Sequence, residues 1–156
     1  MRVNDLITPT RIARCQDSTS KKRVLEQVSA LLAEDAPDLT AVDIVDSLIG
    51  RERLGSTALG HGVAIPHGRM RGLRQPAGAF ISLSQGIDFD APDHQPVDLV
   101  FALIVPDESN QEHLQLLAQL AEMFSDMAFC RRLRDAQSST ELFELLKNWE
   151  SDRVPA

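Results

Sequence analysis

The feature that most constrains the fold is the run VDLVFALIV at residues 97–105, which carries one charge in nine residues. A strand with one face in water alternates between apolar and polar residues, whereas a strand that is apolar at almost every position has both faces buried. A second segment, AGAFISLS at residues 77–84, alternates well enough to form another strand. We therefore expect residues 97–105 to form a central strand of a sheet that helices cover on both faces.

Helical periodicity predicts the layers around this sheet. Apolar residues recur at intervals of three and four over residues 21–34, as on one face of a helix. A capping box at Thr40 predicts a second helix that ends near Arg53. A third, longer helix has His113 in its first turn, and a last helix follows Ser138.

Chain length and composition support one globular domain. At 156 residues, with 43% hydrophobic and 25% charged residues, the chain is long enough to bury a core. The sequence predicts an α/β fold, a layered domain with a mixed β-sheet of about four to five strands flanked by helices on both faces. We expect the domain to span residues 1–156, with its core at about 3–150.

Net charge and cysteine spacing exclude several classes of protein. A formal charge of −7 disfavours a nucleic-acid partner, because affinity for the phosphate backbone comes largely from Lys and Arg. Cys15 and Cys130 lack the CxxC spacing of a thiolate zinc site, and a reducing compartment suits them. No window is apolar enough for a membrane span, and the N-terminus lacks the apolar segment of a signal peptide. We expect a cytoplasmic protein with no membrane insertion.

The stretch LGHGVAIPHGRM at residues 59–70 places a histidine on a bend of the chain. His67 stands between a proline, which fixes φ, and Gly68, which tolerates backbone angles that a side chain forbids. Such a corner tends to expose its side chain, and an exposed neutral imidazole is a nucleophile for a phosphoryl group. Neighbouring glycines let backbone N–H groups approach an anion, and Ser56 and Thr57 add hydroxyl groups. These residues alone leave a phosphate loop and a plain turn equally open.

The other histidines have plainer interpretations. His94 lies in the polar turn APDHQP, where a structural role is expected. His61 precedes His67 by six residues, too far along an extended chain for both to bind one metal ion. No HExxH, HxxE or HxH pattern occurs, so a metal-dependent hydrolase is an alternative that the sequence does not support.

Three longer segments carry a resemblance to a known family. They are RERLGSTALGHGVAIPHGRM at 51–70, QPVDLVFALIVP at 95–106 and EHLQLL at 112–117. Together they resemble the type 2 enzyme IIA domains of the bacterial phosphoenolpyruvate phosphotransferase system, the fructose and mannitol group. The segments SKKR at 20–23 and CRRLRDAQS at 130–138 are most similar to the nitrogen-regulatory members.

The resemblance implies a role for each matched residue. His67 corresponds to the residue that accepts the phosphoryl group, on the ring nitrogen distal to the backbone. His113 and Arg51 correspond to residues that stabilise the phosphoryl group, through a hydrogen bond or positive charge. Ser56, Thr57 and Gly68 would form the phosphate loop. We expect no metal ion and no cofactor.

The implied activity is that of a protein-histidine phosphotransferase in the nitrogen-related phosphotransferase system. Its implied partners are an HPr-like phosphoryl donor and regulatory target proteins of transport or of nitrogen and carbon control. One alternative is a sugar-specific enzyme IIA of the fructose or mannitol type, which passes phosphate to a IIB component. Another is a non-catalytic interaction module that keeps the fold and has lost phosphorylation.

The sequence also departs from the family pattern at three positions. His61 stands where relatives more often carry asparagine or an acidic residue, and His94 replaces a common asparagine. Gln115 stands where nitrogen-type domains have another histidine. A second imidazole near the site would alter its response to pH, so His61 is the departure with a chemical consequence.

Overall fold

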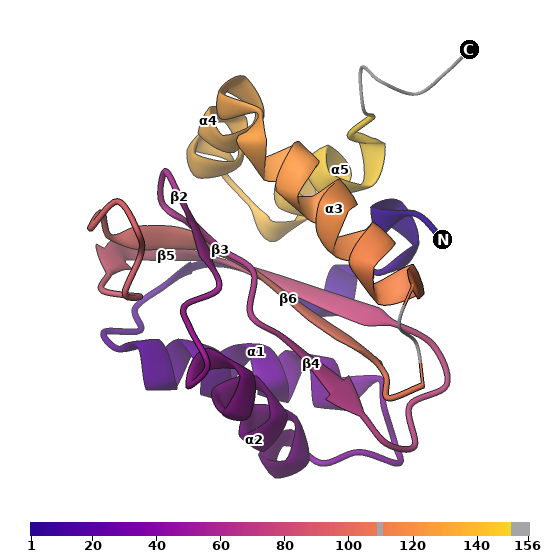
Figure 1. Ribbon diagram of the computed structural model, residues 1–156. Helices are drawn as coiled ribbons and strands as arrows, with labels where there is room; N and C mark the ends of the chain where they lie inside the picture. Colours follow the sequence, from indigo (N-terminus) through magenta and orange to yellow (C-terminus); the bar gives the residue numbers. More distant parts are fainter. Residues whose placement is uncertain (109–110, 151–156) are drawn as a thin grey trace.

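In the computed structural model, which describes residues 1–108 and 111–150, strand β6 (Val97–Pro106) is the centre of a mixed sheet (Figure 1). The strand order is β1-β5-β6-β3-β2, and β4 also pairs with β6. The other strands are β1 (Ile12–Gln16), β2 (Ala58–Gly60), β3 (Val63–Ala64), β4 (His67–Met70) and β5 (Ala77–Ile87). The predicted central strand is therefore confirmed.

β6 has a different neighbour on each side. β5 pairs with it in antiparallel register, with Phe80 opposite Phe101. On its other side β3 and then β4 run parallel to it, and His67 is opposite Leu103. Successive side chains from Leu99 onward enter the two hydrophobic clusters in turn, so the near-continuous apolar run supplies both faces of the sheet.

Helices cover both faces of the sheet (Figure 1). Helices α1 (Lys21–Glu34) and α2 (Ala41–Glu52) pack on one face. Helices α3 (Gln111–Ser125), α4 (Met127–Asp135) and α5 (Ser139–Asn148) cover the other, together with 3-10 turns at Val3–Asp5 and Pro9–Arg11. The predicted α/β class with two helical layers is confirmed, and the sheet of the described residues has six strands.

Side-chain caps begin four of these helices. The side chain of the N-cap residue accepts a hydrogen bond from the backbone N–H three residues on, as the predicted capping signals require. These N-caps are Ser20, Thr40, Asp126 and Ser138. The sequence therefore sets the helix starts locally, before any packing against the sheet.

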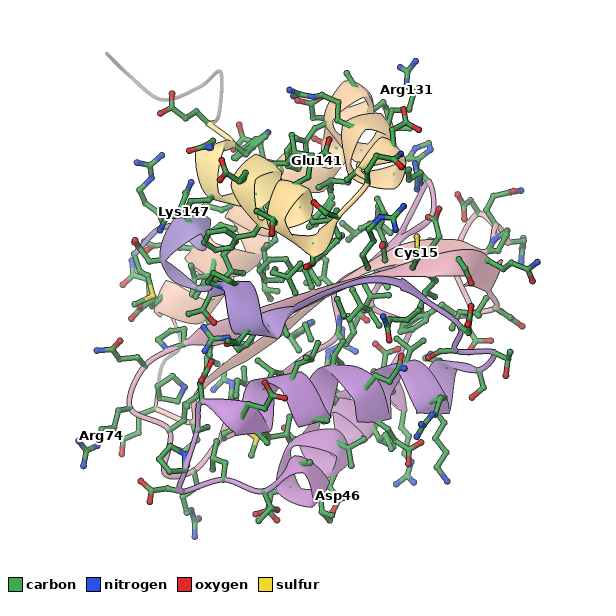
Figure 2. All side chains as sticks on the ribbon, turned by 180° about the vertical axis from the view of Figure 1, so that it is seen from behind. Cys15, Asp46, Arg74, Arg131, Glu141 and Lys147 are labelled. Atoms are coloured by element: carbon green, nitrogen blue, oxygen red, sulfur yellow. The ribbon has the colours of Figure 1, made fainter. Side chains whose placement is uncertain are left out.

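Charged side chains lie on the outer sides of both helical layers. Figure 2, which views the molecule from behind, shows Asp46 on α2, and Glu141 and Lys147 on α5. All three are exposed. Within residues 1–108 and 111–150, the helices are too short or too polar to cross a membrane.

The structure adds strands that the sequence pattern did not predict. β1, whose sequence is IARCQ, has a single large apolar residue, Ile12, and is recognised as a strand only by its parallel pairing with β5. β2 lies among the glycines that precede His67, where we expected a phosphate loop or a turn, and it forms a short hairpin with β3. Both are three to five residues long, so local periodicity is too weak to identify them.

A tight turn ends the β2–β3 hairpin and is fixed to the rest of the fold. Gly60 and Gly62 have φ of 97° and 82°, and His61 between them has φ of 57°. The carbonyl of His61 accepts a hydrogen bond from Arg134, whose guanidinium also binds the carboxylate of Asp98 on β6. This turn directs β3 alongside β6, and so delivers the chain to His67.

Candidate active site

His67 opens strand β4 instead of standing at an exposed corner. The backbone N–H of Leu103 on β6 donates to the carbonyl of Pro66 at 2.9 Å, and His67 is the first residue of the β4–β6 pairing. The imidazole is half-buried, and so less exposed than its place between Pro66 and Gly68 led us to expect. The physical reason is that pairing with the central strand draws the Pro66–Gly68 segment into the sheet.

Gly68 is required for close packing and not for its backbone angle. Its φ lies outside the left-handed region, which corrects the conformational reason given above. A Cβ added at Gly68 would collide with Oγ of Ser47 on α2 and lie 3.2 Å from the Ser47 Cβ. The same Oγ donates to the carbonyl of Arg69 at 3.1 Å, so α2 lies directly against β4. A glycine here brings the end of α2 close to the histidine.

A backbone hydrogen bond fixes the tautomer of His67. Nδ1 of the ring lies 2.8 Å from the carbonyl oxygen of Ile65. A carbonyl oxygen only accepts, so in the neutral ring the proton is on Nδ1 and the lone pair is on Nε2. Nε2 is the nitrogen distal to the backbone, and its lone pair is what a nucleophile needs.

His113 lies beside His67 with neither ring nitrogen bonded. The two ring centroids are 5.4 Å apart with planes at 67°, an edge-to-face arrangement. His113 is in the first turn of α3 and only 7% exposed. Nδ1 and Nε2 are both buried, and neither has a hydrogen-bond partner among the described residues. An unpaired buried polar group costs about 1–3 kcal/mol, so His113 is suited to bind a partner that residues 1–108 and 111–150 do not supply.

Both imidazoles are held in their neutral forms. Burial is the main reason that the pKa of His67 lies below 6.5, and the positive charge of Arg51 adds to this effect. The hydrogen bond to Ile65 and the charge of Glu52 act in the opposite direction on this pKa. Burial also lowers the pKa of His113, with further contributions from His67 and Arg69. At neutral pH the pair is therefore uncharged, which leaves Nε2 of His67 unprotonated.

Arg51 lies near this pair, in the last turn of α2. Its Nη1 donates to the carbonyl of Gly55 at 2.8 Å, which folds the guanidinium over the turn that follows the helix. Its charge lowers the pKa of His67, after the larger effect of burial. The structure thus brings His67 and His113 together, and the charge of Arg51 acts on His67.

The two predicted hydroxyl ligands have partners elsewhere in the fold. Ser56 Oγ donates to the carbonyl of Phe89 at 2.6 Å and accepts from the N–H of Ala58 at 3.1 Å. The hydroxyl of Thr57 donates to the carboxylate of Glu52. Both side chains therefore hold the loop between α2 and β2, and a phosphate contact for either stays a prediction.

Glu52 is a site residue that the sequence reasoning did not single out. Its side chain is 5% exposed, and its carboxylate lies 2.9 Å from the ammonium group of Lys21. The signal was available, because Glu52 follows Ile44 and Leu48 at intervals of four, so it occupies the buried stripe of α2. A carboxylate on a buried stripe is uncommon unless it is paired.

The remaining histidines and the cysteines lie apart from this arrangement. His61 and His94 are exposed residues of turns, with φ of 57° and 59°. Cys15 is exposed on β1, and Cys130 is buried in α4. In the part of the chain that the structure describes, no three His, Cys, Asp or Glu side chains form a group that could hold a metal ion.

Comparison with known proteins gives one family and a set of close relatives. Residues 5–149 match the family described as the phosphoenolpyruvate-dependent sugar phosphotransferase system, EIIA 2. A nitrogen regulatory protein of Pseudomonas aeruginosa is 42% identical over 146 residues, which cover 94% of this chain and 95% of that protein. The resemblance deduced from the sequence is therefore confirmed.

Solved structures agree with the fold. The crystal structure of nitrogen regulatory protein IIA-Ntr from Neisseria meningitidis superposes with a TM-score of 0.86 at 40% identity, and covers 92% of this chain and 98% of that one. Enzyme IIAMTL of Escherichia coli, in a complex with phosphorylated enzyme IIBMTL, gives a TM-score of 0.74 at 21% identity, with 90% and 96% covered. The second similarity concerns the fold alone.

Proposed function

Because the chain belongs to the family of type 2 enzyme IIA domains of the phosphoenolpyruvate-dependent sugar phosphotransferase system, we propose that it carries a phosphoryl group on Nε2 of His67. Membership of this family implies phosphoryl transfer in general. The observation that supports His67 as the carrier is its pairing with His113, whose ring centroid is 5.4 Å away and whose two buried nitrogens have no partner among the residues that the structure describes. An incoming phosphoryl oxygen would give His113 the partner that it lacks.

The proposed reaction is an in-line transfer between two histidines. Nε2 of His67 forms a bond to phosphorus while the phosphorus–nitrogen bond of a donor phosphohistidine breaks. The proton on Nδ1 stays in place, so the phosphorylated ring becomes cationic and its charge is stabilised by the Ile65 carbonyl. The N–H of His113 and the guanidinium of Arg51 share the charge of about −2 on the phosphoryl group.

The donor and the consequence of phosphorylation are part of the proposal. An HPr-like protein would supply the phosphoryl group from phosphoenolpyruvate. The addition of a dianion beside Arg51 changes the charge of this surface, so partner proteins of transport or of nitrogen and carbon control would distinguish the two states. Similarity to nitrogen regulatory proteins at 42% identity supports regulation over sugar transport. A cytoplasmic location stays a prediction.

The test is phosphorylation of the purified protein with phosphoenolpyruvate, the first enzyme of the system and an HPr-like donor. We expect one acid-labile, alkali-stable phosphoryl group per chain, assigned to Nε2 by phosphorus NMR. Substitution His67→Ala should abolish it. Two controls, His61→Asn and His94→Asn, remove exposed imidazoles from turns, keep a residue that tolerates the positive φ, and should leave labelling unchanged.

Each other result has a definite meaning. Labelling that survives His67→Ala would move the site to another residue, and a wild-type protein that stays unlabelled would favour the non-catalytic interaction module. Transfer of the phosphoryl group onward to a IIB cysteine would identify a sugar-specific enzyme IIA. Partners that bind the His67→Ala protein and not the phosphorylated wild type would identify a regulator.

A further inference from the structure

We propose that Glu52 and Thr57 are positioning residues for His67, because together they hold the backbone carbonyl that fixes its tautomer. This inference rests on the proposed function of His67 as the phosphoryl carrier. Neither residue touches the imidazole in a hydrogen bond; they act through the Ile65 segment. The connection runs from α1 through the end of α2 and the following loop to the first residue of β4.

The buried carboxylate of Glu52 is the fixed point of this connection. It accepts a hydrogen bond from the Thr57 hydroxyl and two weaker ones, at 3.3 Å, from the Thr57 backbone N–H. On its other side it is paired with Lys21 at 2.9 Å. The Lys21 ammonium is in turn 4.7 Å from the centroid of the Phe89 ring and 3.3 Å from the Asp90 carboxylate. Lys21, on which the position of Glu52 depends, is therefore itself held by two further contacts.

Thr57 transmits this position to the histidine through one pair of backbone hydrogen bonds. Its carbonyl accepts the N–H of Ile65 at 3.0 Å, and the carbonyl of Ile65 accepts Nδ1–H of His67 at 2.8 Å. Ile65 is 3% exposed, so its backbone N–H and carbonyl need partners within the protein. These two hydrogen bonds supply them. A shift of Thr57 would move the carbonyl that keeps the proton on Nδ1.

The arrangement has a chemical consequence for the transfer. If the Ile65 carbonyl moves away, the neutral ring is free to carry its proton on Nε2, which removes the nucleophilic lone pair from the reacting nitrogen. The same carbonyl stabilises the cationic phosphorylated ring, so its displacement weakens the product as well as the nucleophile. Glu52 also raises the pKa of His67 against the larger effect of burial, which places its charge close enough to act on the ring.

The alternative is that Glu52 and Thr57 only hold the loop together, and three variants distinguish the two roles. Thr57→Val removes the hydroxyl and keeps the shape and the backbone N–H. Thr57→Ser keeps the hydroxyl and serves as the conservative rescue. Glu52→Gln keeps the size of the side chain and removes the charge that pairs with Lys21. Ser29→Ala is the control, because it deletes another buried hydroxyl bond, to Leu25 within α1, outside this connection.

The measurements are the nitrogen-15 chemical shifts of the His67 ring, its titration midpoint, the initial phosphorylation rate and the Tm. In Thr57→Val and Glu52→Gln we expect the Nδ1–H tautomer to lose population, the titration midpoint to move to lower pH and the rate to fall about tenfold. Thr57→Ser should restore all three. Ser29→Ala should lower the Tm and leave the ring shifts and the rate unchanged.

Ring shifts, titration midpoint and rate that stay at wild-type values in Thr57→Val and Glu52→Gln, while the Tm falls, would overturn the proposal and leave a structural role only. If Glu52→Gln does not fold, Thr57→Val decides. The NMR measurements use the unphosphorylated full chain, so they test the positioning even if the wild type accepts no phosphoryl group. An unlabelled wild type with a displaced tautomer in the variants would therefore reject the proposed function and keep this inference.

Discussion

The His113 side chain lowers the stability of the unphosphorylated fold as well as having a proposed role in phosphoryl transfer. Its two ring nitrogens are buried and have no hydrogen-bond partner within residues 1–108 and 111–150, an arrangement that costs free energy of folding. Replacing it by an apolar side chain of similar volume, His113→Leu, removes this penalty. We expect the free energy of unfolding of the unphosphorylated protein to stay equal or to rise by about 1 kcal/mol, measured by urea denaturation. In the same variant the phosphorylated form should hydrolyse several times faster, because the phosphoryl oxygen loses a donor.

A loss of stability in His113→Leu of more than about 2 kcal/mol would contradict this account, since it would mean that the imidazole is paired in the folded chain. A side chain that serves only in packing would lower stability when it is replaced. The expected result for His113→Leu is an unchanged or higher stability together with faster hydrolysis of the phosphorylated form, which indicates a functional side chain. His94→Asn is the control, because His94 is exposed in a turn with φ of 59°, which asparagine tolerates, and the exchange should change neither quantity appreciably.

The contact between α2 and β4 is the element-scale feature that builds the site. Gly68→Ala would place a methyl group against Ser47, so α2 or β4 must shift. We expect a loss of about 1–3 kcal/mol in the free energy of unfolding and a slower phosphorylation, because the shift moves Arg51 relative to His67. Combining it with Ser47→Ala, which removes the colliding Oγ, should recover part of both losses.

Gly50 provides the control on the same helix. It is exposed in α2, and an added Cβ has nothing within 4 Å, so Gly50→Ala should raise stability by about 0.5–1 kcal/mol through helix propensity alone. Equal effects of alanine at Gly50 and Gly68 would contradict the close packing of α2 on β4.

At the scale of the whole molecule, the two imidazoles make stability depend on pH. The folded chain lowers the pKa of His67 and of His113 below 6.5, in both cases chiefly by burial. The unfolded chain therefore binds more protons just below this pH, and stability falls as the pH drops from 6.5. Thermal denaturation between pH 8 and pH 5 should show a plateau above 6.5 and a declining Tm below it.

The double variant His67→Gln, His113→Leu should flatten this decline of Tm with falling pH.

Asp93 titrates in a separate, more acidic pH range. The backbone N–H of His61 holds the pKa of its carboxyl below 3.8, so its contribution to stability is lost only in stronger acid. An unchanged slope between pH 6.5 and pH 5 in the double variant would show that other groups cause the acid sensitivity.

The sequence determined what local chemistry can determine. The apolar run at 97–105 made the central strand, the capping residues set the starts of four helices, and the IPHG motif located the histidine. Each of these depends on neighbours within a few residues, so a single chain segment carries the information.

Tertiary structure decided what depends on residues far apart in the sequence. β1 exists through its pairing with β5, and His67 is half-buried because β6 pairs with its strand. His113 meets His67 across 46 positions, and its ring nitrogens are buried because α3 packs against the sheet. Local periodicity predicts which face of a helix or strand is apolar. The hydrogen-bond partner of a polar atom depends instead on how distant elements pack. That packing places the imidazoles of His67 and His113 side by side.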